Sequence, residues 1–162
     1  MNKKVLSIAY AALIAAHYVV LTLICNALGL ANHAIQIRFS EALTILPFFT
    51  PAAIPGLTIG CVLSNILTGC MPLDVIFGSL ATFLGALGTY YLRKFPKYLA
   101  PVCPILANTL IVPFILSYVY HFEGSLPYFM ITVGIGEVIS CGVLGILLLN
   151  VLKKYEKPIF SL

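Results

Sequence analysis

The sequence predicts an all-α integral membrane protein, a single domain of six transmembrane helices spanning residues 1–162. Of these residues 61% are hydrophobic and 9% are charged, whereas soluble domains carry about 25% charged residues. The mean hydropathy is +1.07, and the apolar runs approach the length of about 20 residues that a helix needs to cross a bilayer. The period-two alternation of barrel strands is absent, so helices are the remaining way to span a lipid bilayer.

Glycines, prolines and charges divide the apolar sequence into six expected spans. The second and third are short and are separated by the stretch TPAAIPG, so we expect half-length or tilted helices there. The fourth ends at RKFPK and the sixth at KKYEK. The expected spans are Val5–Leu30, Ser40–Phe49, Gly56–Thr68, Asp74–Leu92, Pro101–Tyr120 and Leu126–Leu152.

The basic residues support six crossings, because Lys and Arg accumulate in cytoplasmic loops. With six spans, eight of the nine basic residues share one side and only Arg38 lies on the other. We therefore expect both termini in the cytoplasm, and the net charge of +4 requires no nucleic-acid partner. The apolar region after MNKK exceeds the 7–15 residues of a signal peptide, which argues against cleavage. The eight are Lys3, Lys4, Arg93, Lys94, Lys97, Lys153, Lys154 and Lys157.

The motifs of catalysis and metal binding are absent from the sequence. There is no phosphate-binding loop and no hydrolase or metalloprotease signature, so we expect a protein that is not an enzyme. The five cysteines lack the clustered spacing of zinc sites, and neither a metal nor a cofactor is expected. Cys61 and Cys70 lie near one end of the third span, where a disulfide is the less favoured alternative.

Polar side chains inside apolar spans are the candidate functional residues, because ionisable groups there are costly. Glu137 lies about ten residues into the last span, roughly 15 Å deep at the usual helical rise, and most of its helical neighbours are small. We favour a ligand contact over close helix packing for this carboxylate. Asn108 and Asn65 are equally suited to bind a ligand or to join two helices by a hydrogen bond.

The start of the second span and the start of the fourth carry further charges. Asp74 follows a proline, so N-capping is its leading interpretation, and Ser40 is a similar candidate cap with Glu41 in the first turn. Capping does not explain Arg38, which lies at the expected membrane edge.

The outer half is rich in aromatic residues, some suited to the membrane interface and others to stacking on a flat ligand. Together these residues indicate a site for a planar, polar molecule that is open to the outside. The aromatic residues are Phe39, Tyr118, Tyr120, Phe122, Tyr128 and Phe129.

Small residues recur every four positions along the first span. Ala11 and Ala15 form one row, and Ala12 and Ala16 form another beside it. This spacing allows another helix to approach closely. The alanines are therefore candidates for contact with a partner protein, and packing within the bundle is an equal alternative.

The stretch QIRFSEALTILPFFTPAAIPGLTIGCVLSNILTG resembles the QueT family, the substrate-binding (S) components of energy-coupling factor (ECF) transporters for queuosine precursors. The similarity continues through DVIFGSLATFLGALGTYYLRK, LANTLIVP and GEVISCGVLG, and so covers nearly the whole chain.

This resemblance implies a six-helix S component that binds a solute near the outer face of the membrane. Its partners would be a transmembrane coupling protein, which contacts the alanines of the first span, and two ATPase subunits. The solute would be queuine or a 7-deazaguanine such as the 7-aminomethyl form. Glu137 would accept from the N–H donors of the base beside Asn108, while Glu41 or Asp74 would meet an exocyclic ammonium.

Two other classes of protein remain open from the residues alone. One is an S component for another vitamin, such as thiamine or biotin. The other is a small membrane enzyme or a structural protein in which Glu137 only fixes packing.

Overall fold

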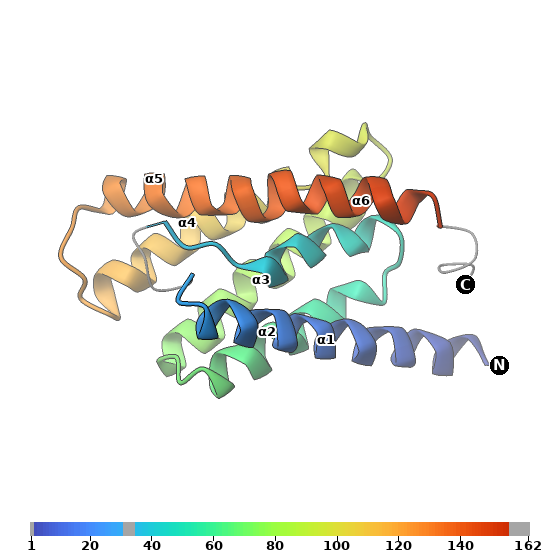
Figure 1. Ribbon diagram of the computed structural model, residues 1–162, viewed down its shortest axis with the longest axis horizontal. Helices are drawn as coiled ribbons and strands as arrows, with labels where there is room; N and C mark the ends of the chain where they lie inside the picture. Colours follow the sequence, from blue (N-terminus) through green and yellow to red (C-terminus); the bar gives the residue numbers. More distant parts are fainter. Residues whose placement is uncertain (1, 31–34, 156–162) are drawn as a thin grey trace.

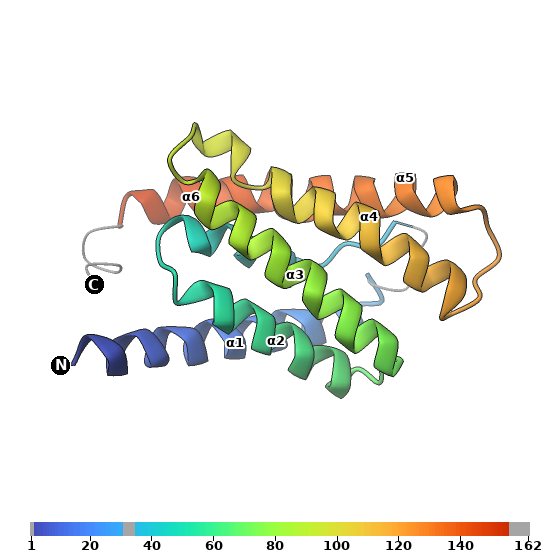
Figure 2. The ribbon, with the colours of Figure 1, turned by 180° about the vertical axis from the view of Figure 1, so that it is seen from behind.

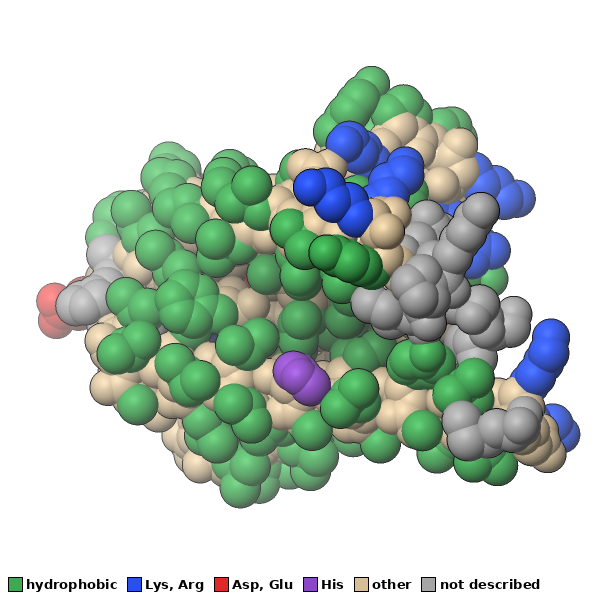
Figure 3. Space-filling model, turned by 45° about the vertical axis from the view of Figure 1, so that its right-hand side comes forward, with side chains coloured by type: hydrophobic (Ala, Val, Ile, Leu, Met, Phe, Trp, Pro, Cys, Tyr) green, Lys and Arg blue, Asp and Glu red, His purple; other side chains and the backbone are tan. Residues whose placement is uncertain are grey.

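In the computed structural model, residues 2–30 and 35–155 are described, and all regular structure within them is helical. Four stretches are long and apolar enough to cross a membrane: Lys3–Ala27, Pro72–Leu92, Lys97–Tyr118 and Leu126–Lys153. Large apolar side chains cover much of the molecular surface (Figure 3), as expected for a protein whose solvent is lipid. The predicted all-α membrane fold is confirmed.

The long helices frame the molecule. Helix α1 (Lys3–Ala27) lies along one side, and α3 (Pro72–Leu92) crosses between α2 (Ala53–Leu67) and α4 (Val102–Tyr118), as Figure 2 shows from behind. A short 3-10 turn, η2 (Lys97–Leu99), precedes α4.

The last span is one continuous helix of three segments (Figure 1). Helix α5 (Leu126–Glu137) passes into a π-helical stretch, η3 (Val138–Leu144), and then into α6 (Gly145–Lys153). Widened turns of this kind are rare and occur frequently at functional sites. Here the widened stretch begins directly after Glu137.

The predicted short second and third helices are present as η1 (Phe39–Phe48) and α2, but η1 is a 3-10 helix. Pro47 lacks a backbone donor, and the Thr44 hydroxyl donates to the Glu41 carbonyl oxygen at 2.6 Å, two features that compete with regular α-helical bonding. Helix η1 packs against α1, α3, η3 and α6 and so occupies the centre of the bundle. The central apolar core includes Tyr18, Ile45, Leu57, Ala86 and Leu149.

Two glycines bring α1 and α2 into close contact. A Cβ atom at Gly56 would lie 2.7 Å from the Ala11 carbonyl oxygen, and one at Gly60 would lie 3.0 Å from that of Ala15. Ala11 and Ala15 therefore pack inside the bundle, which was one of the two interpretations of the alanine rows.

The second alanine row faces outward. Ala12 and Ala16 are exposed, and they line an apolar groove of about 660 Å³ between α1 and α2, together with Ile59 and Leu63. We call this the α1–α2 groove. The edges of Ala11 and Ala15 also reach it.

The start of α1 and the end of α6 lie at the same end of the bundle (Figure 1). Most basic side chains gather there, on the first residues of α1, the turn between α3 and α4, and the end of α6 (Figure 3). We call this the basic end. Lys157, part of the predicted basic cluster, lies outside the described residues. The other seven of that cluster are Lys3, Lys4, Arg93, Lys94, Lys97, Lys153 and Lys154.

Candidate functional site

A cavity of about 370 Å³ opens at the end of the bundle opposite the basic end. It lies among the last turns of α1, α2 and α4, the first turns of α3 and α5, and the extended residues that lead into η1. We call it the outer cavity. Its volume falls within the range of about 300–1,000 Å³ typical of small-molecule sites.

One wall of the outer cavity is polar. It comes from α1, the segment before η1, α2 and the start of α3, and it contains three of the six predicted site residues: Arg38, Asn65 and Asp74. Sequence reasoning did not single out the other members of this wall, because isolated Thr, Asn and Gln residues near helix ends carry no distinctive signal. Those members include Thr22, Asn26, Gln36 and Thr68.

The facing wall is apolar and aromatic, and it comes from α4, α5 and the loop that joins them. Two pairs of aromatic rings contribute: Tyr120 stacks on Phe122 with centroids 5.6 Å apart, and Tyr128 meets Phe129 edge to face at 5.6 Å. Four of the six predicted aromatic residues therefore lie in the cavity wall. A flat ring held against this wall would gain stacking contacts.

Asp74 and Tyr120 join the two walls. The Tyr120 hydroxyl donates to Asp74 Oδ2 at 2.8 Å and accepts from the Met71 backbone N–H at 3.1 Å. The N-cap of α3 is Met71, and no side chain caps that helix. The prediction that Asp74 caps α3 was therefore wrong: the carboxylate lies within the first turn and turns toward the loop after α4.

Arg38 lies where the chain enters the bundle. Its backbone N–H donates to Ser140 Oγ at 3.1 Å, and its Nη2 donates to Gln36 Oε1 at 3.3 Å. The backbone passes α5 closely at Gly136, where a Cβ atom would lie 2.1 Å from the Gln36 carbonyl oxygen. Only glycine allows this approach.

The other three predicted site residues form a buried cluster toward the basic end. Glu41 is 2% exposed, Asn108 4% and Glu137 8%. Asn108 Nδ2 lies 3.4 Å from Glu41 Oε2, and the Tyr18 hydroxyl donates to Glu41 Oε1. We call Glu41, Asn108, Glu137, Tyr18 and Cys141 the carboxylate cluster.

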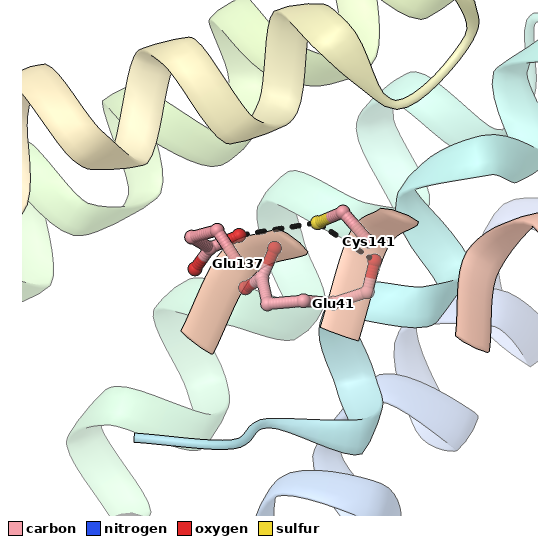
Figure 4. Close-up of side chains that lie close together, drawn as sticks. All are labelled: Glu41, Glu137 and Cys141. Carbon is pink, nitrogen blue, oxygen red and sulfur yellow. Dashed lines mark hydrogen bonds between the residues drawn. The ribbon is translucent and has the colours of Figure 1, made fainter. Parts of the chain in front are cut away.

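Cys141 connects the two glutamates (Figure 4). Its Sγ lies 3.1 Å from Glu137 Oε2 and 3.4 Å from the Glu41 carbonyl oxygen. One ligand atom from each of Glu41, Glu137 and Cys141 lies within 4.8 Å of the others, a spacing that would also suit a metal ion. The expectation that no metal binds here stays a prediction.

The position of Ser40 corrects the sequence interpretation, whereas Glu41 lies in the first turn of the second helix as predicted. Arg38 is the residue at the N-cap of η1 and makes no side-chain cap, and the Ser40 hydroxyl has no partner in the described part of the chain. The extended residues before η1 carry the chain into the bundle before the helix begins. Glu41 therefore lies deep inside and not at the membrane edge.

Sequence reasoning assigned neither Cys141 nor Tyr18 of this cluster to the site, and the more informative omission is Tyr18. Its side chain is 1% exposed. The sequence did carry a signal for this residue. Tyr18 lies within the first apolar span, and a tyrosine hydroxyl that is buried there needs a hydrogen-bond partner.

The carboxylate cluster continues the outer cavity along the same helix faces. Tyr18 lies one turn from Thr22 on α1, and Asn108 lies one turn from Val112 on α4. Residues four apart share a helix face and are separated by about 6 Å along the axis, a little more than one turn. The carboxylates thus lie about one helical turn beyond the floor of the cavity.

The fold and the site define a polytopic helical membrane protein with a small-molecule cavity at one end. A family model described as QueT transporter matches residues 8–154. The chain belongs to the QueT transporter family.

A curated relative supports this assignment. The protein named Queuosine precursor transporter QueT from Lactococcus lactis subsp. cremoris is 38% identical over 83 residues, which make up 51% of this chain and 48% of the relative. The match therefore spans about half the length of that relative. No solved structure matches the chain.

Proposed function

We propose that this protein is the substrate-binding subunit of a transporter that imports a queuosine precursor, a 7-deazaguanine, with energy from a shared ECF module. The observation that carries the proposal is the outer cavity: an aromatic wall faces a polar wall, and two buried carboxylates lie directly beyond it. Family membership and the name of the curated relative support the same solute class.

The chemistry of a guanine-like base suits this arrangement. Such a base presents adjacent N–H donors, which one carboxylate accepts together, and a carbonyl that an amide can read. We assign the N–H donors of the base to Glu137 and its carbonyl group to Asn108. To reach these two residues, the base would move inward from the outer cavity by about one helical turn, along the aromatic wall. Glu41 already accepts from Tyr18 and Asn108, whereas Glu137 accepts from the weaker donor Cys141 Sγ, so Glu137 is the carboxylate with more capacity for the solute.

The residues of the polar wall would hold the rest of the solute. Asp74 is the carboxylate within the outer cavity and would pair with an exocyclic ammonium group. Asn65 and Arg38 lie in the same wall, where they would orient the solute between Asp74 and the carboxylate cluster.

The coupling protein of the module would dock on the α1–α2 groove. Ala12 and Ala16 leave that surface shallow and apolar, so a partner helix can approach closely in the bilayer. The two ATPase subunits would act through the coupling protein. The basic end would face the cytoplasm and the outer cavity the outside of a bacterial cell.

A ligand panel tests the proposal. Titration calorimetry on the detergent-purified chain should detect binding of 7-aminomethyl-7-deazaguanine or queuine, and none of thiamine or biotin. Binding of thiamine or biotin in place of the deazaguanines would assign the chain to another vitamin. A folded protein that binds none of the four would refute the proposal.

A further inference from the structure

Both side-chain oxygens of Glu41 are already in contact with donors of the protein. The Tyr18 hydroxyl on α1 donates to Oε1, and Asn108 Nδ2 on α4 lies 3.4 Å from Oε2. Glu41 is buried, at 2% exposure, and so is Tyr18, at 1%. A solute could bind this carboxylate only by displacing one of the two donors, which would then be buried without a partner. Glu41 is thus placed to hold its two neighbours rather than to bind the solute.

The contact with Glu41 fixes the orientation of the Asn108 amide. A side-chain amide can adopt two orientations related by a half-turn, which exchange its acceptor oxygen and its donor nitrogen. An ionised carboxylate only accepts hydrogen bonds, so the reversed orientation would bring Asn108 Oδ1 against Glu41 Oε2 with no proton between them. Two such acceptors facing each other are costly in a buried site. Glu41 therefore keeps Nδ2 on its own side, and Tyr18 keeps the Glu41 carboxylate in place.

The orientation of Asn108 decides which group it presents to a solute. Nδ2 carries two protons, so its contact with Glu41 leaves one donor on the same nitrogen. The amide also lies close to Glu137. Under the proposed function, on which this inference rests, a base that donates its N–H groups to Glu137 has its carbonyl oxygen next to those groups, beside the remaining donor of Asn108.

We propose that Glu41 and Tyr18 are positioning residues that determine specificity: they hold Asn108 with a donor toward the solute, so that the site selects a carbonyl oxygen beside the N–H edge of the base. Neither residue needs to touch the solute. Without them the amide is free to turn, and its oxygen would then meet the carbonyl oxygen of the base. The preference for an acceptor at this position is therefore set by two residues behind the one that contacts the base.

The test compares 7-aminomethyl-7-deazaguanine with its 6-thio analogue, in which sulfur replaces the carbonyl oxygen. The N–H donors of the two bases are the same, and sulfur is the weaker acceptor. We call the ratio of the two affinities the carbonyl preference. Calorimetry on the purified wild type should give a carbonyl preference of about three- to tenfold, as expected for one neutral hydrogen bond. Asn108→Ala should reduce the carbonyl preference to within about twofold.

The double variant Tyr18→Phe/Glu41→Leu removes the positioning pair. Both replacements are apolar and similar in size to the original side chains, so no buried phenol is left without an acceptor. The carbonyl preference should again fall to within about twofold, because Asn108 is free to turn. A purely structural role would lower both affinities by the same factor and leave the carbonyl preference unchanged. Tyr18→Phe alone is a milder change that should give an intermediate preference, and it keeps the test available if the double variant does not fold.

Thr89→Val is the matched control. Thr89 is fully buried and donates to the Ala100 carbonyl oxygen at 2.9 Å. Its replacement also deletes a buried hydroxyl, but near the end of α3 that leads to the basic end, away from the carboxylate cluster. The carbonyl preference of this variant should equal that of the wild type.

An unchanged carbonyl preference in the folded double variant, or in folded Tyr18→Phe where the double variant does not fold, would overturn the inference and leave the proposed function intact. Equal wild-type affinity for the two bases would also overturn it, because Asn108 would then not read the carbonyl oxygen. If the folded wild type binds neither base, the proposed function fails and the inference falls with it.

Discussion

Replacing Glu137 by glutamine is the sharpest test of the carboxylate cluster. The change nearly preserves the shape of the side chain. It converts one acceptor oxygen into an NH₂ group that would point at the donors of the bound base. Because a buried polar group without a partner is costly, we expect a large loss of solute affinity.

The size of the loss follows from the burial of the site. Removing one partner of a buried charged contact costs about 2–5 kcal/mol, which corresponds to a loss in affinity of about 30-fold to several thousandfold. Glu137 is 8% exposed and belongs to a cluster whose other members are also buried, so little screening by water reduces this effect.

The folded protein should tolerate the change. One carboxylate oxygen of Glu41 and one of Glu137 lie within 4.8 Å of each other. If both groups were ionised, they would repel each other by about 3.5 kcal/mol at that distance and an effective dielectric constant of about 20. A neutral amide removes this repulsion and is cheaper to hold in a bilayer than a charge. The variant should therefore be recovered from membranes in normal yield.

Calorimetric affinity for a 7-deazaguanine, measured on the purified variant, decides the question. Glu123→Gln is the control, since Glu123 is an exposed carboxylate in the loop between α4 and α5, and this variant should bind normally. Unchanged binding in Glu137→Gln would make Glu137 a packing residue and move the site to the outer cavity around Asp74.

Three further predictions concern the partner, the packing and the orientation. Ala16→Leu should weaken copurification with the coupling protein and leave solute binding unchanged, because Ala16 is exposed in the α1–α2 groove; loss of solute binding by the solitary subunit would contradict this. Gly60→Ala should lower the free energy of unfolding by about 1–3 kcal/mol, because the new Cβ atom would lie 2.8 Å from that of Tyr18. Thermal unfolding in detergent measures this change. Gly142→Ala is the matched control, since the nearest atom to its new Cβ would lie at an ordinary 3.8 Å. Equal melting temperatures for the Gly60→Ala and Gly142→Ala variants would refute the packing argument. Reporter fusions should place both termini in the cytoplasm, and termini on opposite faces would exclude the six-span topology.

Hydropathy and breakers were sufficient to predict the helices because lipid imposes one requirement on every span: its backbone must bond within itself. The same information could not give the depth of Glu41. That depth depends on a few extended residues before η1, whose hydrogen bonds come from side chains distant in sequence, such as Ser140. Helix capping was a reasonable local interpretation of Asp74, but its observed partner, Tyr120, is 46 positions away.

The alanine rows show a different limit of sequence reasoning. A four-residue spacing predicts a surface suited to close helix contact but does not say which helix will use it. Gly56 and Gly60 place α2 against Ala11 and Ala15 and so leave the adjacent row outward. The internal interpretation is confirmed for Ala11 and Ala15, and contact of Ala12 and Ala16 with a partner protein stays a prediction.

The extended segment before η1 has a consequence for how the family can vary. Other parts of the molecule fix the path of its main chain. The Arg38 N–H donates to Ser140 Oγ, and the Phe39 N–H donates to Cys25 Sγ at 3.1 Å. The Gln36 carbonyl oxygen lies against Gly136, where there is no room for a side chain. These contacts fix the path of the peptide and not the identity of the residues along it. Across homologues, substitutions at 37 and 39 should therefore be tolerated more readily than any side chain at 136. A homologue that lost Gly136 would have to change the route of the 36–39 segment at the same time.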